Sequence, residues 1–155
     1  MAQVAGLGTS ASQDSQFGAG TIAGRTVLDT TNTVTQNASL TDFDINVQAA
    51  GGDIKLKVFR ENAGTYEFVG ESQAITLTAT GAQNFTLDTP FDVQTGDLFA
   101  IFFANQFTRV FTSNGGGTTV WVNGEISADT ATSTFSGTIP SGRALLVGVN
   151  GIAAT

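Results

Sequence analysis

Carboxylates are the main groups in this sequence that can do chemistry, because histidine and cysteine are absent from all 155 residues. Histidine titrates near neutral pH and is the commonest metal ligand, and cysteine supplies the thiolate nucleophile. Without them the chain cannot assemble a Ser-His-Asp or Cys-His centre, or the usual zinc, haem and iron–sulfur sites. The composition therefore favours binding or scaffolding over catalysis. We predict no enzyme activity, no catalytic residue, no cofactor and no metal site.

Asp42 and Asp44 lie two residues apart, so their carboxylates share one face of a predicted strand. Such a pair can begin a calcium site. The strand pairing predicted below instead places Lys57 opposite Asp44, which gives a solvated ladder of opposite charges contributing only ~0–1 kcal/mol per pair. We favour the ladder.

Three further aspartates, Asp88, Asp92 and Asp97, lie beside turn-forming residues, where an aspartate usually accepts backbone N–H bonds. A glycosidase needs two carboxyl groups about 5–10 Å apart. The 13 acidic residues make some such pair inevitable, so a carboxylate-dependent glycosidase ranks third among the possible functions. No EF-hand, P-loop or nucleophile elbow is present, and Gly115–Gly117 precedes strand-forming residues and is read as a loop.

Aromatic residues offer one alternative, a sugar-stacking platform made from Tyr66, Phe107, Phe111 and Trp121. However, the sequence has 12 phenylalanines beside one tryptophan and one tyrosine, and phenylalanine mainly fills cores because its ring has no polar group. We therefore assign these rings to the core or its rim.

A hairpin is the most specific structural prediction. Ser39–Val47 and Ile54–Val58 alternate between apolar and polar residues, and Gly51 and Gly52 between them permit a reversal. The register that satisfies both faces pairs Val47 with Ile54, Ile45 with Leu56, Phe43 with Val58, Asp44 with Lys57 and Asn46 with Lys55.

Other alternating segments follow at the spacing typical of a sandwich or barrel, with no convincing helical period. Leu98–Phe103 (LFAIFF) is apolar on both faces, as expected of a central strand covered on each side. We predict an all-β fold, an antiparallel β-sandwich of jelly-roll type. The other predicted strands are Arg25–Asp29, Tyr66–Leu77 with a break or bulge near Gly70, Asn84–Asp88, Phe107–Ser113, Thr118–Val122 and Arg143–Val149.

We divide the chain into an N-terminal arm, residues 1–20, and a single β-sandwich domain, residues 21–155. The arm is rich in Gly, Ala, Ser and Gln, and we expect it to be loose in isolation and to order on a partner, if it has a role at all. Residues 127–137 form either a loop or an exposed hairpin. The uncharged tail, Val147–Thr155, is expected to pack at a subunit interface.

The formal net charge is −7 and the six basic residues are scattered, so we expect no nucleic-acid partner. The longest apolar run, Leu98–Ala104, is much shorter than the ~18–20 residues that span a bilayer, so we expect no membrane partner. No secretion signal is visible at the N-terminus. We expect a soluble protein made in a cytoplasm.

Three stretches resemble the small β-sandwich proteins that decorate the capsids of tailed bacteriophages, and that also occur in head fibres and tail tips. They are TVLDTTNTVTQNASLTDFDI, IKLKVFRENAGTYEFVGES and FTLDTPFDVQTGDLFAIFF, and the similarity covers roughly residues 20–125. The matching patterns are DTT, KVFR and VQxGDLxxIF, none of which is a catalytic signature.

The resemblance implies a jelly roll, often trimeric, that clamps neighbouring copies of the major capsid protein on the outside of a virion. The expected partners are therefore the major capsid protein and further copies of this chain in a homotrimer. An alternative is a host-recognition module of a head fibre or tail tip, which binds surface carbohydrate through its loops.

Overall fold

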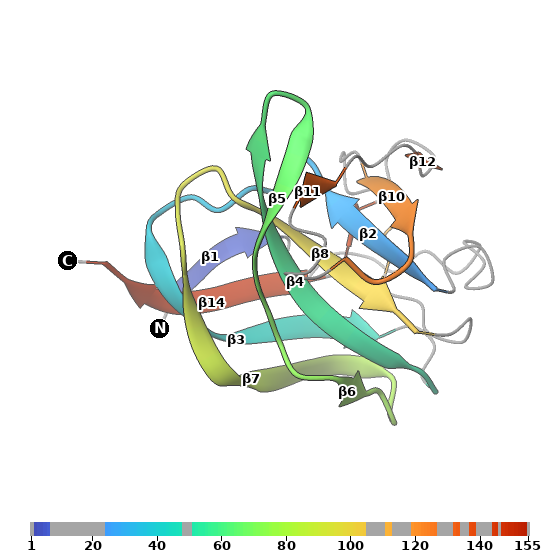
Figure 1. Ribbon diagram of the computed structural model, residues 1–155. Coiled ribbons are helices and arrows are strands. Elements are labelled where there is room, and N and C mark those ends of the chain that lie inside the picture. Colours follow the sequence, from blue (N-terminus) through green and yellow to red (C-terminus); the bar gives the residue numbers. More distant parts are fainter. Residues whose placement is uncertain are drawn as a thin grey trace.

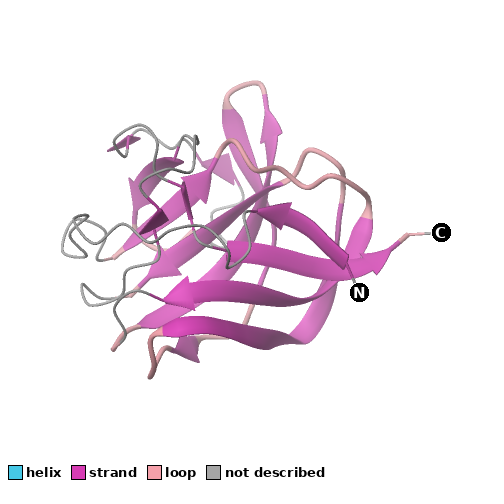
Figure 2. Cartoon of the chain, turned by 180° about the vertical axis from the view of Figure 1, so that it is seen from behind, coloured by secondary structure: helices cyan, strands magenta, loops and turns pink. Residues whose placement is uncertain are grey.

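The computed structural model describes residues 2–6, 24–47, 51–104, 111–112, 119–126, 132–133, 137–138, 144–145 and 147–154. Within these residues the chain forms strands, turns and bends and no helix, as Figure 2 shows. The prediction of an all-β fold is confirmed.

Two antiparallel sheets pack face to face as a β-sandwich (Figure 1). The small sheet has the order β1-β14-β3-β7, and the large sheet has the order β11-β5-β4-β8-β2-β10-β12, with β6 paired to β4. The strands of the small sheet are β1 (Ala2–Gly6), β14 (Val147–Ala153), β3 (Ala38–Val47) and β7 (Gly81–Val93). Those of the large sheet are β11 (Thr132–Ser133), β5 (Thr65–Glu71), β4 (Asp53–Asn62), β8 (Leu98–Phe103), β2 (Arg25–Asp29), β10 (Thr119–Asn123), β12 (Gly137–Thr138) and β6 (Ile75–Thr76); β9 (Phe111–Thr112) pairs with β13 (Ala144–Leu145) separately.

Several strand predictions are confirmed in detail. Arg25–Asp29 and Leu98–Phe103 have the bounds of β2 and β8. The predicted strand Tyr66–Leu77 is divided into β5 and β6, and the ladder between β4 and β5 shifts register beside Gly70. Most of the predicted strand Phe107–Ser113 and of the segment 127–137 lies outside the described residues.

The two ends of the chain are part of the small sheet, which corrects two predictions. β1 pairs with β14, and Val4 and Ala5 are buried, so residues 2–6 are a structural strand; the remainder of the predicted arm, residues 7–20, lies outside the described residues. β14 lies between β1 and β3, so its apolar residues Val147 and Val149 are buried inside their own chain. In the C-terminal tail only residues 152–154 are exposed among those described.

The predicted hairpin between β3 and β4 is wrong, because these strands belong to opposite sheets. β3 pairs with β14 and β7, whereas β4 pairs with β5, β6 and β8. The alternation of apolar and polar residues in β3 and β4 was identified correctly. It determines which side chains face the core, but it does not determine which strands pair with each other. The connection after β3 crosses from one sheet to the other instead of turning back in the same sheet.

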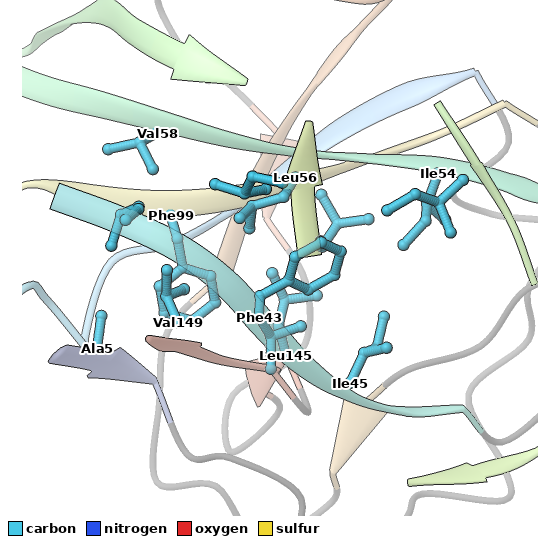
Figure 3. Close-up of a cluster of buried hydrophobic side chains, with 14 of the residues drawn as sticks. Ala5, Phe43, Ile45, Ile54, Leu56, Val58, Phe99, Leu145 and Val149 are labelled. Carbon is cyan, nitrogen blue, oxygen red and sulfur yellow. The ribbon is translucent and has the colours of Figure 1, made fainter. Parts of the chain in front are cut away.

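The apolar sides of β3 and β4 meet in the core between the sheets (Figure 3). Phe43 and Ile45 of β3 and Ile54, Leu56 and Val58 of β4 are almost completely excluded from solvent. Because β3 and β4 face each other across the sandwich, both of their apolar rows are buried. A two-stranded hairpin cannot bury both rows by itself.

β8 is covered on both sides, as predicted. Phe99, Ile101 and Phe103 belong to the core between the sheets, and Leu98 and Ala100 belong to a second cluster on the outer side of the large sheet. The second cluster also contains buried Leu28, Phe59 and Ile126, and Tyr66, Phe68, Val120 and Val122 pack against it.

β3 contains one extra residue, Thr41, that both neighbouring ladders skip. The pairing with β14 and with β7 shifts register between Leu40 and Asp42. As a result Leu40 and Phe43, three residues apart, are both wholly buried, which a regular two-residue alternation does not allow.

On β7 the same irregularity leaves residues 87–90 without partners in β3. Pro90 is accommodated there because a proline cannot donate to a ladder. The side chain of Gln73 donates to the carbonyl oxygen of Thr86 and accepts from the backbone N–H of Asp88, so it protects this part of the edge strand. Asp88 and Asp92 lie within β7, which corrects their assignment to turns.

Phe91 closes the contact between the sheets at this side of the sandwich, where its ring lies directly over Gly70 of β5. A Cβ atom on residue 70 would lie 2.5 Å from Cδ2 of Phe91. The close approach of β7 to β5 therefore requires a residue without a side chain at this position.

We expect Gly70→Ala to destabilise the protein by about 1–3 kcal/mol, because the added methyl group forces the Phe91 ring to move. Urea unfolding measures the change. In a Phe91→Ala background the ring is absent, and the same substitution should cost much less. An equal cost in both backgrounds would show that the contact with Phe91 is unimportant.

Candidate functional site

The outer face of the small sheet carries an array of carboxylates and carboxamides from three strands, which we call the Asp–Asn lattice: Asp42, Asp44, Asn84 and Asn150. Antiparallel pairing places Asn150 of β14 opposite Asp42 and Asn84 of β7 opposite Asp44. Since β3 lies between β14 and β7, its two aspartates can contact both flanking strands.

Each Asn amide in the lattice bridges the two aspartates. Nδ2 of Asn84 donates to Oδ2 of Asp42 (2.6 Å) and to Oδ1 of Asp44 (3.0 Å). Nδ2 of Asn150 donates to Oδ2 of both, at 2.8 and 2.9 Å. The four bonds use all amide hydrogens of the two asparagines.

Asp42 is only 6% exposed although it lies on an outer face. Burial by itself raises the pKa of Asp42, but hydrogen bonds from Thr41, Asn150 and Asn84 outweigh it and hold the pKa below the ordinary value of 3.8. The lattice therefore keeps a well-shielded negative charge at the centre of the small sheet.

The chemical character of this face is that of a hydrogen-bond acceptor. The asparagine hydrogens are taken by the aspartates, and the asparagine oxygens accept no bond from the described residues. The carboxylates add negative charge. A complementary surface would therefore present N–H donors or positive charge.

Beside the lattice, a groove of about 480 Å³ lies at the end of the small sheet where the chain terminates. Residues 37–39, 92–94 and 152–154 line this C-terminal groove. Among the described residues, Ile152 is the large hydrophobic residue that is exposed to solvent, at 59%. Ile152 and Asp92 lie on either side of Ser39 in the sheet. The groove therefore combines apolar surface with one negative charge.

Both interpretations of Asp42 and Asp44 from the sequence need correction. The expected ion pair with Lys57 does not form, because Lys57 belongs to the other sheet. The amides of the lattice take the place of the predicted cations. Within the described part of the chain, no three His, Cys, Asp or Glu residues are grouped so that they could hold a metal ion.

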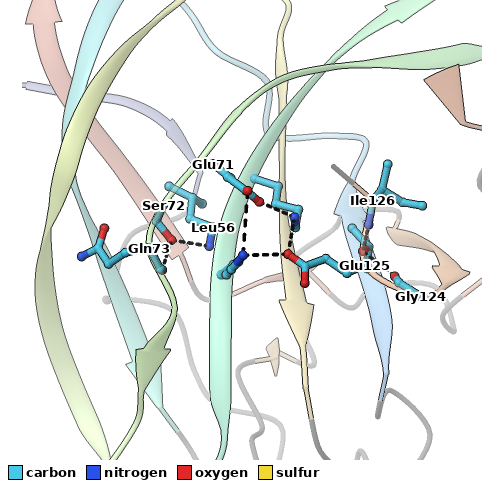
Figure 4. A network of polar contacts seen from close by, with 10 residues as sticks. Leu56, Glu71, Ser72, Gln73, Gly124, Glu125 and Ile126 are labelled. Atoms are coloured by element: carbon cyan, nitrogen blue, oxygen red, sulfur yellow. Dashed lines mark hydrogen bonds and ion pairs between the residues drawn. The ribbon is translucent and has the colours of Figure 1, made fainter. Parts of the chain in front are cut away.

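Lys57 instead lies on the outer side of the large sheet, wholly buried rather than solvent-facing as predicted. Its Nζ contacts Oε2 of Glu71 (2.5 Å) and Oε2 of Glu125 (2.9 Å). Nζ of Lys55 contacts the same oxygen of Glu125 at 2.9 Å and lies 3.8 Å from Oε1 of Glu71. Figure 4 shows Glu71 and Glu125 converging on the two amino groups.

This cluster of two positive and two negative charges joins β4, β5 and the segment after β10. Burial raises the pKa of Glu125. The hydrogen bonds from Lys55 and Lys57, together with their positive charges, lower it by more, so the pKa of Glu125 lies below its ordinary value. The hydrogen bond to Glu125 raises the pKa of Lys55. Lys55 and Glu125 therefore stabilise each other in their ionised forms.

A second ion pair fixes the turn before β8. The guanidinium of Arg60 donates to both oxygens of Asp97, each at 2.8 Å, and Asp97 also accepts the backbone N–H of Gln94. The prediction that Asp97 accepts a backbone bond in a turn is confirmed. Asp97 is 1% exposed, so this bidentate pair is a structural clamp.

The structure does not assemble the proposed aromatic platform from described side chains. Tyr66 is half-buried against the outer cluster of the large sheet. Phe107 lies outside the described residues, as does Gly115–Gly117. Trp121 lies in β10 and Phe111 in β9, and their side chains are not among those described.

Sequence reasoning did not identify Asn84 and Asn150 as partners of the aspartates, or Glu71 and Glu125 as partners of the lysines. Asn84, Asn150 and Glu125 reach their partners only after the chain has crossed between sheets, whereas Glu71 lies in the strand that directly follows β4. The alternating position of Asn84 in its predicted strand was the one local signal that it faces outward.

Comparisons with known proteins give no match: no family model, no curated protein and no solved structure resembles this chain closely enough to be assigned to it. In the described residues there is no helix of the length and hydrophobicity needed to cross a membrane.

The lattice predicts a pH-dependent contribution to stability. Because the pKa of Asp42 is lowered on folding, its carboxylate stabilises the fold above the unfolded value near 3.8 and loses this effect as the pH falls through the lower folded pKa. Asp42→Asn should therefore cost about 1–3 kcal/mol at pH 7, and this difference should shrink at pH values below 3.8.

Urea unfolding at a series of pH values measures this difference. Asp88→Asn is a suitable control, because Asp88 is exposed and outside the lattice; it should have little effect at any pH. A constant difference between the wild type and Asp42→Asn down to the lowest pH would contradict the assignment.

Proposed function

We propose that this chain is a structural virion protein, a decoration protein that binds the outer surface of the major capsid shell of a tailed bacteriophage and stabilises it. The proposal starts from the three sequence stretches that resemble this family. The observation on the molecule that supports it best is the Asp–Asn lattice, a polar face already fixed by hydrogen bonds within its own sheet.

A decoration protein has to act as a rigid body, and the sandwich supplies one. The two sheets share a continuous core, and the bidentate Arg60–Asp97 pair and the Lys55–Lys57–Glu71–Glu125 cluster tie separate strands together. The chain also passes from one sheet to the other between β2 and β3, between β3 and β4, between β6 and β7 and between β7 and β8, while β4, β5 and β6 stay in the large sheet. This alternation supports the jelly-roll form of the sandwich.

The outer face of the small sheet is our proposed contact with the capsid. Because the asparagine and aspartate side chains already hold one another in place, a partner that binds there loses little side-chain entropy. Its acceptors and negative charge suit a capsid surface with exposed arginine, lysine or backbone N–H groups.

The C-terminal groove is our proposed contact between copies of the chain. The sequence predicted an interface for the whole tail, and the sheet buries its first part, so the exposed part, with Ile152 and its groove, remains for self-association. An exposed apolar side chain beside a groove of similar character is a common feature of such contacts.

Attachment to capsids tests the first contact. Thr86→Lys places a positive charge on an exposed residue directly opposite Asp42, and we expect it to weaken binding to capsids lacking the protein by roughly tenfold or more. Copies bound per particle, measured over a range of protein concentrations, give the change. Glu61→Lys, a larger change of charge on an exposed residue of β4 in the other sheet, is the control and should bind normally.

Equal binding by the wild type and Thr86→Lys would contradict this placement of the contact. A decoration protein should also be present in hundreds of copies per virion, and a fibre tip in tens or fewer. A low copy number together with binding on a glycan array would favour the host-recognition alternative.

Self-association is tested by size-exclusion chromatography with light scattering at micromolar concentration. We expect a trimer for the wild type and for Ile152→Val, and a monomer for Ile152→Asp, because a charge in the groove is costly to bury. A monomeric wild type would contradict the proposed homotrimer.

A further inference from the structure

The buried amino group of Lys57 contacts two partly exposed carboxyl groups and lies beside an aromatic ring. The Lys57 side chain is 0% exposed, and its Nζ lies 2.5 Å from Oε2 of Glu71, 2.9 Å from Oε2 of Glu125 and 5.7 Å from the ring centre of Phe68. A nucleophile, an acyl carbon and a possible proton carrier are therefore within contact distance of one another.

We propose that Lys57 and Glu71 join in an intramolecular isopeptide bond, with Glu125 carrying the protons. The two residues are direct partners in the β4–β5 ladder, which holds the amine against the carboxyl group. The inference does not depend on the proposed function in the virion.

The reaction is a condensation that needs no oxidant or cofactor. Glu125 takes one proton from the Lys57 ammonium and passes it to the Glu71 carboxylate, which leaves a neutral amine facing a carboxylic acid. Nζ attacks Cδ of Glu71 and forms the C–N bond. Glu125 then takes the second proton from the nitrogen and delivers it to the departing hydroxyl of the tetrahedral intermediate, which leaves as water, so that Glu125 ends in its ionised form.

Two features of the site favour this reaction. Reactants held in contact can have effective molarities of ~10⁵–10⁸ M. The Lys57 amine is closed off from solvent beside the edge-on pair of Phe59 and Phe68, whereas the Glu71 side chain is 29% exposed, which leaves a path by which the released water can escape.

The bond would close the β4–β5 hairpin at the end opposite its turn. Lys57 and Glu71 are the last pair of this ladder, beyond the register shift next to Val58. A covalent link there would hold β5 against β4 even when the outer end of the hairpin opens.

Mass spectrometry of the purified full-length protein tests the proposal. Lys55 and Lys57 are the only lysines in the sequence, so the Lys55→Arg and Lys57→Arg variants form a matched pair on one strand. After correction for the substitution, the wild type and Lys55→Arg should be lighter than Lys57→Arg by the mass of one water molecule. Proteolysis should yield a branched peptide that joins Lys57 to Glu71.

Glu125→Gln tests the proton carrier. We expect this variant to keep its β circular dichroism spectrum and to lack the mass loss, or to acquire it far more slowly. Formation of the bond at the wild-type rate would contradict the role of Glu125.

Two results would overturn the bond itself. One is a wild type that has the same corrected mass as Lys57→Arg, with Lys57 recovered in a linear peptide. The other is a branched peptide that joins Lys57 to a residue other than Glu71.

Discussion

The burial of two apolar rows, one on β3 and one on β4, against each other is the constraint on which the rest of this molecule depends. Phe43 and Ile45 on one side and Ile54 and Leu56 on the other occupy the centre of the core. Because these rows face each other, the strands that carry them must belong to different sheets. Apart from β9 and β13, which pair with each other, every later described strand joins one of the two layers, and the polar sides of both rows are turned outward.

The two outward sides have different chemistry because their surroundings differ. On β3 the outward aspartates meet amides from β14 and β7 and form an open lattice of acceptors. On β4 the outward lysines meet Glu71 and Glu125, and of these four side chains only Lys57 is closed off completely. The small sheet therefore offers a surface of acceptors, while the large sheet carries a cluster of ion pairs around one buried amino group.

Local pattern was sufficient to predict the strands but not their partners. β2 and β8 were predicted at their observed bounds, because β8 is a continuous apolar segment and turn-forming residues flank both strands. The alternation in β3 and β4 identified the buried residues correctly, yet the same alternation fits a hairpin and a crossing between sheets equally well. The predicted side-chain contacts depended on this wrong strand pairing. The amides that contact Asp42 and the glutamates that contact Lys57 were therefore not predicted. The uneven spacing of Leu40 and Phe43 was a visible sign of the irregularity at Thr41.

The position of β14 between β1 and β3 has a consequence for how the protein is made. The small sheet cannot be completed until residues 147–153 have left the ribosome, although β1, the partner of β14, is synthesised long before them. Contacts between such distant segments form slowly and leave strand edges uncovered in the meantime. Until then, β1 and β3 each lack a neighbour, and the nascent chain has to be kept from pairing with others during that interval.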